Sequence, residues 1–368
     1  MRIIIAGGGT GGHLFPGIAL AREFKKVHAG TEIMFVGTAE GIEATVVPKE
    51  GFDVRFIRSE GLVRVGAVRT LRSLAKLPLS IKDSYALLRR FNPDLVFGFG
   101  GYSSGPVVLT AFLMGTPAMI HEQNSIPGVT NKLLGKFVRA IAVTYQDSIE
   151  FFPKYKTYLT GNPVRGEILC GDRGRGRRIF GLDKERFTIF ALGGSSGAHS
   201  INKAVSEGLP YLEDLKDKIQ FLHQTGAKDF SATKESYRSM GFHGTVIPFI
   251  YEMADAYAAS DLVISRAGAS TIAELTACGK AAILIPYPFA AGNHQELNAR
   301  KLWDLGAAHI ILDRDLNGKT LMDLIRYIYE DPDARGTMEK ISRSLGRPDA
   351  AQKIVEIAMG LVSKKWEV

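Results

Sequence analysis

Residues 3–13 read IIIAGGGTGGH, and five of the six positions from 7 to 12 are glycine. An apolar strand, a glycine-rich turn and a following helix form a phosphate cradle, because glycines let the backbone approach the oxygens and a helix N-terminus favours anions. His13 ends the glycine run, where an imidazole could act as a general base near neutral pH. The alternative interpretation is that His13 only begins the helix and bonds to backbone.

The glycine spacing also fits the G-x-G-x-x-G pattern of dinucleotide-binding proteins. Such a site needs an acidic residue at the end of the second strand to hold the ribose hydroxyls. Here the expected second strand, EIMFVGT, ends in Gly37 and Thr38. A Walker loop needs Lys and then Ser or Thr after the last glycine, whereas His13 and Leu14 follow here. The sequence therefore supports neither hydride transfer nor ATP hydrolysis.

Three further polar stretches follow expected strands, where ligands bind in parallel sheets. They are GFGGYSSGP (98–106), HEQN (121–124) and SRAGASTIAELTACG (265–279). In the last stretch, Ser270 and Thr271 lie in a first helical turn, where hydroxyls and backbone N–H groups suit a diphosphate. Glu274 follows about one turn later, where a carboxylate suits ribose hydroxyls. A capping or surface role is the alternative for Glu274.

Strands alternate with helical patterns along the whole chain, which predicts parallel sheets with helices on both faces. The first series of expected strands is Arg2–Ala6, Glu32–Val36, Val54–Ile57, Asp94–Phe97, Ala118–His121 and Ala140–Val143. The second series is Thr188–Leu192, Ile219–His223, Thr245–Pro248, Leu262–Ser265, Ala282–Ile285 and His309–Leu312. Helical patterns include residues 18–27 and 293–305. The stretch CGDRGRGRR (170–178) is predicted to be a surface linker or loop between the two series.

The second series opens much as the first does. Residues 189–199, IFALGGSSGAH, align without a gap with residues 3–13. This internal repeat of one phosphate-loop unit predicts two doubly wound domains that bind ligands at the carboxyl ends of their strands. His199 is the counterpart of His13, so the repeat by itself could account for a histidine at this position.

Composition agrees with two globular domains, since the chain has 368 residues, 45% of them apolar and 23% charged. No apolar run reaches 18 residues, so we expect no spanning helix. The sequence begins directly with an expected strand, so we expect no signal peptide. Cys170 and Cys278 match no disulfide or metal spacing, and a reducing cytosol is the simplest location.

The net charge of +8 is unevenly distributed. The segment 58–90 holds eight basic and two acidic residues, interleaved with leucine, valine and isoleucine. Basic and apolar residues on one segment indicate a surface that meets an anionic membrane. A solvated helix face over a small core stripe is the alternative. We expect no nucleic-acid partner, because neither aromatic interleaving nor a reading motif is present.

Several long motifs carry a resemblance to a known family. In chain order they are GGGTGGHLFPGIALA, GFGGYSSGP, HEQNSIPGVTNK, GNPVR, GGSSGAHSIN, SRAGASTIAEL and NHQELNA. Over nearly its whole length the sequence resembles the MurG family, glycosyltransferases that add N-acetylglucosamine to lipid I to make lipid II in peptidoglycan synthesis. The resemblance implies the α/β GT-B fold, with two Rossmann-like, doubly wound domains facing across a cleft.

The resemblance also implies a division of labour between two domains. Residues 1–164, with a C-terminal helix at 350–368 packing back, would bind the lipid I acceptor and dock to the membrane. Residues 165–349 would bind UDP-N-acetylglucosamine. Four residues of the first domain would complete the donor pocket: Thr10, Gly11, Gly12 and Asn124. The other substrate-binding residues implied are Arg165, Ser195, Ile250, Ala269, Ser270, Thr271, Ile272, Ala273, Glu274 and Gln295. Some members carry two adjacent glutamines where this chain has His294 and Gln295.

The chemistry implied is one inverting displacement that gives a β-1,4 link. A base removes the acceptor proton as UDP departs, with His13 the first candidate and Glu122 the second. Helix N-termini and Arg165 would neutralise the departing diphosphate, without a metal or other cofactor. The acidic stretches DRD (313–315) and DPD (331–333) resemble metal-binding pairs of other glycosyltransferases, and we interpret them as turn or cap residues.

The acceptor of this family is lipid-linked, which favours peripheral docking of segment 58–90 at the cytoplasmic face of the plasma membrane. Other cell-wall synthesis proteins are further expected partners. Three alternatives remain open on the sequence. They are a GT-B enzyme with another lipid acceptor, a UDP-N-acetylglucosamine epimerase, and a non-catalytic subunit that binds the nucleotide sugar.

Overall fold

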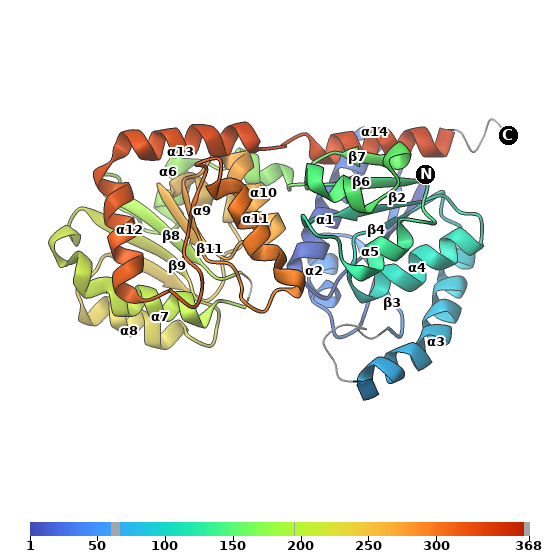
Figure 1. Cartoon of the computed structure of the whole chain (residues 1–368), viewed down its shortest axis with the longest axis horizontal. Coiled ribbons are helices and arrows are strands. Elements are labelled where there is room, and N and C mark those ends of the chain that lie inside the picture. Colours follow the sequence, from blue (N-terminus) through green and yellow to red (C-terminus); the bar gives the residue numbers. More distant parts are fainter. Residues whose placement is uncertain (60–66, 195, 364–368) are drawn as a thin grey trace. The chain divides into compact units, whose positions relative to one another are not determined.

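The computed structural model describes residues 1–59, 67–194 and 196–363, and it separates into two compact units. The N-terminal unit consists of Met1–Arg165 and Arg347–Val368, and the C-terminal unit of Gly166–Gly346. Each unit is a parallel sheet covered by helices (Figure 1). The predicted fold class, two Rossmann-like domains of the GT-B type, is therefore confirmed.

The N-terminal unit has seven parallel strands in the order β3-β2-β1-β4-β5-β6-β7. Its strands are β1 (Arg2–Ala6), β2 (Glu32–Gly37), β3 (Asp53–Phe56), β4 (Leu95–Gly98), β5 (Ala118–Glu122), β6 (Ala140–Val143) and β7 (Thr157–Leu159). Its α-helices are α1 (Gly11–Val27), α2 (Glu43–Lys49), α3 (Ala67–Phe91), α4 (Gly101–Leu113), α5 (Val129–Leu134) and α14 (Ala350–Ser363). Two short 3₁₀ turns, Gln146–Phe151 and Lys154–Lys156, lie between β6 and β7.

The core of the N-terminal unit lies on both faces of its sheet, because β1 is apolar at every central position. Ile3 and Ile5 pack on one face with residues of α1 and α14. Ile4 and Ala6 pack on the other face with residues of α3, α4 and α5. A parallel strand that is buried on both faces requires this unbroken apolar run.

The C-terminal unit has six parallel strands in the order β10-β9-β8-β11-β12-β13. They are β8 (Phe187–Leu192), β9 (Ile219–Gln224), β10 (Gly244–Ile247), β11 (Leu262–Ser265), β12 (Ala282–Leu284) and β13 (His309–Ile310). The α-helices are α6 (Arg173–Ile179), α7 (His199–Gly208), α8 (Phe230–Ser239), α9 (Met253–Ala259), α10 (Ala269–Cys278), α11 (His294–Trp303), α12 (Gly318–Glu330) and α13 (Pro332–Leu345). Three 3₁₀ turns are Gly166–Cys170, Leu209–Leu215 and Ala291–Asn293.

One local prediction is wrong: the stretch 170–178 is not a loop, because it contains helix α6. Asp172 caps this helix by accepting a hydrogen bond from the Arg175 N–H at 2.6 Å. Arg175 also pairs with Asp255 of α9 at 2.7 Å. Gly176 faces the Asp255 carbonyl so closely that any side chain there would overlap it. Gly176 therefore serves helix–helix contact and not chain flexibility.

The other differences are at element ends. The predicted strands are all present, with bounds that shift by one or two residues, and the short edge strand β7 was not predicted. The helix after the opening loop begins at Gly11, so it contains His13 in its first turn. Among the described residues, no helix combines the length and hydropathy needed to cross a membrane.

Each sheet buries one histidine ring. His121 of β5 donates through Nε2 to the Gly161 carbonyl at 3.0 Å. His223 of β9 lies 3.0 Å from Asn202 Oδ1 and 3.2 Å from the Tyr237 hydroxyl. Burial lowers the pKa of His121 to about 4 and that of His223 to about 3, from an ordinary value of 6.5. Both rings are therefore neutral in the folded protein.

These two histidines predict acid sensitivity. Because their folded pKa values are depressed, their contribution to stability is complete above pH 6.5 and is lost as the pH falls through about 4. One such shift corresponds to about 3 kcal/mol when protonation is complete. We expect urea unfolding to give a lower free energy of unfolding at pH 5 than at pH 7.5.

A His121→Gln, His223→Gln double variant keeps an amide at each position but cannot titrate, and its stability should depend less on pH in this window. Equal stability of the wild-type protein at pH 5 and pH 7.5 would contradict the prediction.

Candidate active site

His13 lies where the carboxyl ends of β1 and β4 meet. Its Nδ1 is 3.3 Å from Thr10 Oγ1, and its backbone N–H donates to the Thr10 carbonyl at 3.2 Å. Gly100, just after β4, has a φ of +87°, and a Cβ there would lie 3.2 Å from His13 Nε2. Because glycine at position 100 has no side chain, the His13 imidazole fits beside it. The sequence-predicted Thr10, Gly11 and Gly12 adjoin this ring.

The HEQN loop is organised around the carboxylate of Glu122, which is only 2% exposed. One oxygen accepts from the Asn124 N–H at 3.0 Å and from Asn124 Nδ2 at 3.3 Å. The other accepts from the Gly128 N–H at 3.2 Å and from Asn131 Nδ2 at 2.8 Å. Burial raises the pKa of Glu122, and these donors oppose the increase.

This environment argues against Glu122 as the general base. A base must present its lone pairs to substrate, whereas both oxygens of Glu122 are occupied by four donors within a buried loop. The structure therefore gives Glu122 the role of holding Asn124 and the turn that leads to α5. His13 is the candidate base that remains.

Two residues that the sequence analysis did not single out join the HEQN loop to the end of β4. Gln123 Nε2 donates to the Phe99 carbonyl at 2.9 Å. Asn131 Nδ2 donates to the His121 carbonyl at 3.1 Å, and it lies 3.7 Å from where a Cβ on Gly100 would stand. His13 and Asn131, which is bound to the HEQN loop, thus both approach Gly100. No spacing in the sequence indicates these links.

Arg165 is the last residue of the N-terminal unit, although the sequence analysis expected it to open the second domain. Its guanidinium lies 4.7 Å from the ring centroid of Phe15 in α1. A cation over an aromatic face is stabilised by the ring quadrupole. Arg165 is therefore held beside α1, the helix whose first turn contains His13.

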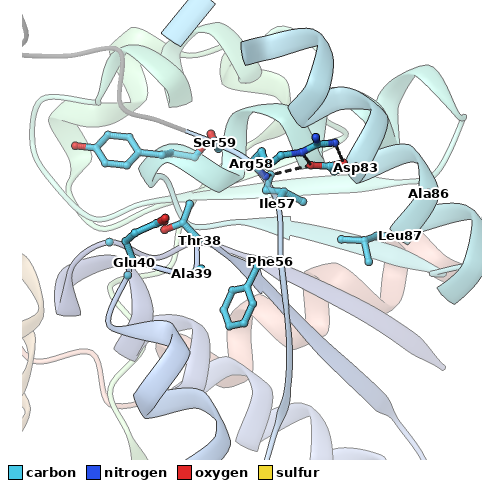
Figure 2. A pocket seen from close by; sticks show the side chains of 13 residues that line it. Thr38, Ala39, Glu40, Phe56, Ile57, Arg58, Ser59, Asp83, Ala86 and Leu87 are labelled. Carbon is cyan, nitrogen blue, oxygen red and sulfur yellow. Dashed lines mark hydrogen bonds and ion pairs between the residues drawn. The ribbon is translucent and has the colours of Figure 1, made fainter. Parts of the chain in front are cut away.

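A pocket of about 880 Å³ opens beside the glycine-rich loop that joins β1 to α1. Gly9 and Thr38 contribute from the ends of β1 and β2, and Glu40 follows Thr38. Figure 2 shows that the paired Arg58 and Asp83 side chains line it as well. Arg58 Nη2 lies 2.6 Å from Asp83 Oδ1, and this hydrogen bond lowers the pKa of Asp83. The pocket therefore has both charges and apolar walls.

In the C-terminal unit, the second glycine loop follows β8. Ser195, a predicted ligand of the nucleotide, lies outside the described residues. Gln224, at the end of β9, donates through Nε2 to the Gly194 carbonyl at 2.9 Å. Its Oε1 accepts from the Ile250 N–H, also at 2.9 Å. Gln224 thus bridges the glycine loop and Ile250, and the Ile250 N–H is already engaged within the protein.

Helix α10 follows β11, the strand next to β8 in the sheet. Ala269 and Ile272 are buried, whereas the other predicted residues of its first turns are half-buried: Ser270, Thr271, Ala273 and Glu274. The Tyr257 hydroxyl donates to Glu274 Oε2 at 3.0 Å and so fixes the direction of that carboxylate. The start of α10 therefore lies at the same edge of the sheet as the glycine loop.

Gln295 and His294 begin α11, after β12. Gln295 Oε1 accepts from the Tyr287 N–H at 2.9 Å. His294 Nδ1 donates to the Ala291 carbonyl at 2.7 Å, so its ring turns back onto its own loop. His294, which stands where some family members have glutamine, thus has a hydrogen-bond partner in its own loop.

The two acidic stretches have separate explanations. Asp331 caps α13 by accepting from the Ala334 N–H at 2.8 Å, as predicted for a cap. Residues 313–315 form a turn, as predicted, and Asp313 within it pairs with Arg266 at 2.5 Å and accepts from Ser200 at 2.8 Å. Within the described ranges, no group of three or more His, Cys, Asp or Glu residues is arranged to hold a metal ion.

Comparisons with known proteins agree with this geometry. The model of the glycosyltransferase family 28 N-terminal domain matches residues 3–143, and that of the family 28 C-terminal domain matches residues 188–354. Together with the two parallel sheets, these matches define the class as GT-B glycosyltransferases of family 28.

A curated relative narrows this class. The chain is 52% identical to the UDP-N-acetylglucosamine–N-acetylmuramyl-(pentapeptide) pyrophosphoryl-undecaprenol N-acetylglucosamine transferase of Thermodesulfovibrio yellowstonii, over 99% of this chain and 100% of the relative. The crystal structure of MurG from Acinetobacter baumannii is 28% identical, with a TM-score of 0.76 over 97% of this chain and 98% of that one. The chain belongs to this family of N-acetylglucosamine transferases.

A further solved structure is similar in fold alone. UDP-GlcNAc 2-epimerase from Neisseria meningitidis, bound to UDP-GlcNAc, is 14% identical with a TM-score of 0.71 over 98% of this chain and all of that one. An identity this low carries no argument about activity.

The hydrogen bonds of Glu122 predict a stability effect. In Glu122→Ala, the Gly128 N–H and the Asn131 amide lose their acceptor inside the protein, which costs about 2–4 kcal/mol. Urea unfolding should therefore show a destabilised N-terminal unit, while Glu150→Ala, an exposed control, changes stability by under about 0.5 kcal/mol. If Glu122→Ala kept its stability but lost activity, the carboxylate would act in the chemistry instead.

Proposed function

We propose that this protein transfers N-acetylglucosamine from UDP-N-acetylglucosamine to an undecaprenyl-diphospho-N-acetylmuramyl pentapeptide, lipid I, and so forms lipid II of peptidoglycan synthesis. The observation that carries the proposal is full-length identity of 52% to a relative with this printed activity. The site agrees with it, because a histidine and two glycine loops stand at the carboxyl edges of two parallel sheets.

The C-terminal unit is the proposed donor site. Its candidate residues follow strands that are neighbours in the sheet, where the order is β10-β9-β8-β11-β12. The start of α10, from Ala269 to Ala273, takes the diphosphate, and Glu274 takes the ribose. The carbonyl of Ile250 takes the uracil, because its N–H is bound by Gln224. The remaining proposed donor-binding residues are Gln295 and, in the glycine loop, Ser195.

The N-terminal unit is the proposed acceptor site. Thr10, Gly11 and Gly12 face the reacting sugar and the acceptor's diphosphate, and Asn124, which Glu122 holds, is a further substrate-binding residue. Arg165, beside Phe15, supplies a positive charge for the departing diphosphate. The pocket beside Gly9 gives the acceptor further room in this unit.

The reaction is one inverting displacement. The His13 imidazole takes the proton of the acceptor hydroxyl as that oxygen bonds to the anomeric carbon of N-acetylglucosamine. The bond from that carbon to UDP breaks, and UDP leaves with the electron pair. Thr10, 3.3 Å from Nδ1, orients the ring and leaves Nε2 as the nitrogen that accepts the proton.

We also propose that α3 docks the protein at the cytoplasmic face of an anionic membrane, where a lipid-linked acceptor lies. In its described part, Lys82, Arg89 and Arg90 are exposed together with the apolar side chains of Leu79 and Tyr85. Arg58 contributes less than the sequence suggested, because Asp83 neutralises it. Other cell-wall synthesis proteins are further proposed partners.

The proposal is tested by transfer of radiolabelled N-acetylglucosamine from UDP to a short-chain lipid I analogue in the presence of EDTA. Labelled lipid product is expected. Donor binding without transfer to this acceptor or to other lipid acceptors would overturn the proposal, and conversion of the free donor would indicate epimerisation.

Replacing the proposed base should affect turnover more than binding. We expect His13→Ala to lower kcat by about 10²–10⁴-fold and to leave the Kd of UDP-N-acetylglucosamine within about twofold. Glu274→Ala is the matched comparison, since it should weaken UDP binding about tenfold through loss of a charged hydrogen-bonding group. Calorimetry gives the Kd values and the transfer assay gives kcat. Equal losses of kcat and donor affinity in His13→Ala would assign His13 to binding.

Membrane docking predicts a local charge effect. Changing Lys82, Arg89 and Arg90 to Gln removes three cations near the surface, each contributing about 1 kcal/mol, so binding to vesicles with anionic lipid should weaken about a hundredfold. The control changes Lys25, Lys26 and Lys49, which are exposed elsewhere on the same unit. A cosedimentation assay in which both triple variants lose equal affinity would show only an effect of net charge.

A further inference from the structure

The carboxylate of Glu43 is buried beneath the opening glycine loop. Glu43 is the first residue of α2, and it is 1% exposed. Its Oε2 accepts from the Gly9 N–H at 2.8 Å. Its Oε1 accepts from the Thr38 N–H at 2.8 Å and from Thr38 Oγ1 at 3.2 Å. One side chain therefore ties the loop after β1 to the end of β2.

Three glycines surround this carboxylate. A Cβ at Gly8, Gly37 or Gly41 would in each case overlap the side chain of Glu43, and the three nearest atoms to each Cβ belong to Glu43. None of these glycines has a positive φ, so the backbone itself would admit another residue. Their lack of a side chain is therefore required by the space that Glu43 occupies.

Glu43 also supports the neighbouring pocket. Gly9 and Thr38, which it binds, line that pocket, and so does Gly41, which it contacts. The loop that it fixes continues directly into Thr10 and His13. We therefore expect a change at Glu43 to shift the His13 imidazole and the wall of the pocket, although Glu43 itself does not line the pocket.

We propose that Glu43 is a positioning residue for the acceptor side of the reaction, an assignment that rests on the proposed function. It holds the Gly9 N–H inward, which sets the path of the loop and so the place of Thr10 and His13. Because the donor is held mainly by the C-terminal unit in this proposal, loss of Glu43 lowers use of the acceptor far more than affinity for the donor.

The first test uses Glu43→Gln. The amide can keep its oxygen toward Thr38, but its NH₂ group then faces the Gly9 N–H, so that one link to the loop is lost. We expect kcat/KM for a lipid I analogue to fall at least tenfold and the calorimetric Kd for UDP-N-acetylglucosamine to stay within twofold. The assay is run well below the melting temperature of the variant.

Glu32→Gln, exposed at the start of β2, is the matched control and should keep wild-type kinetics. An unchanged kcat/KM for the acceptor in Glu43→Gln would overturn the proposal. Equal losses in acceptor use and donor affinity would overturn it as well, because they would indicate general damage to the fold.

The second test measures stability and does not depend on activity. Gly37→Ala should lower the melting temperature strongly, because its methyl group overlaps Glu43. In a Glu43→Ala background the same change should lower it far less, since the overlapping atoms are gone. The control pair is Gly360→Ala, where a Cβ meets nothing within 4 Å, and its effect should be the same in both backgrounds.

Equal effects of Gly37→Ala in the two backgrounds would overturn the link between Glu43 and its glycines. Absence of transfer by the wild-type protein would instead reject the proposed function. The melting experiment still reports on Glu43 in that case, so the two failures are distinguishable.

Discussion

The N-terminal site depends on hydrogen bonds from loop N–H groups to two buried carboxylates. Glu43 holds the loop after β1, and Glu122 holds the loop after β5. Glycine-rich loops lose much conformational freedom on folding, so they need such partners to keep one path. In the C-terminal unit the neutral amide of Gln224 does similar work between Gly194 and Ile250.

Glu43 also explains why a glycine pattern of the dinucleotide-binding type need not bind a dinucleotide. In those proteins an acidic residue after the second strand reaches the ribose hydroxyls. This chain has two acidic residues in that region. Glu40 is exposed and lines the pocket, whereas α2 directs Glu43 inward, where backbone donors and the Thr38 hydroxyl occupy it. The carboxylate that contacts the opening glycine loop is therefore used to hold that loop.

The strands and their order of appearance could be predicted, because runs such as Ile3–Ala6 are buried on both faces and must be apolar throughout. Helix α6 could not, since Gly176 within it is explained only by the approach of α9. The repeat predicted equivalent histidines, but His13 lies beside Thr10 and Gly100 whereas His199 lies 3.1 Å from Asp229. Local sequence locates the loops, and contacts across the sheet decide what each side chain in them can do.

Helix α14 has a consequence for how the chain acquires its structure during synthesis. Ile354, Val355 and Ala358 of this helix belong to the same hydrophobic core as Ile18 and Phe24 of α1. The C-terminal unit is continuous in sequence, whereas the N-terminal unit is completed only by residues after Arg347. On the ribosome, the apolar face of α1 therefore stays without its final cover until almost the whole chain has emerged. The N-terminal unit, whose synthesis begins first, is therefore the last to complete its fold.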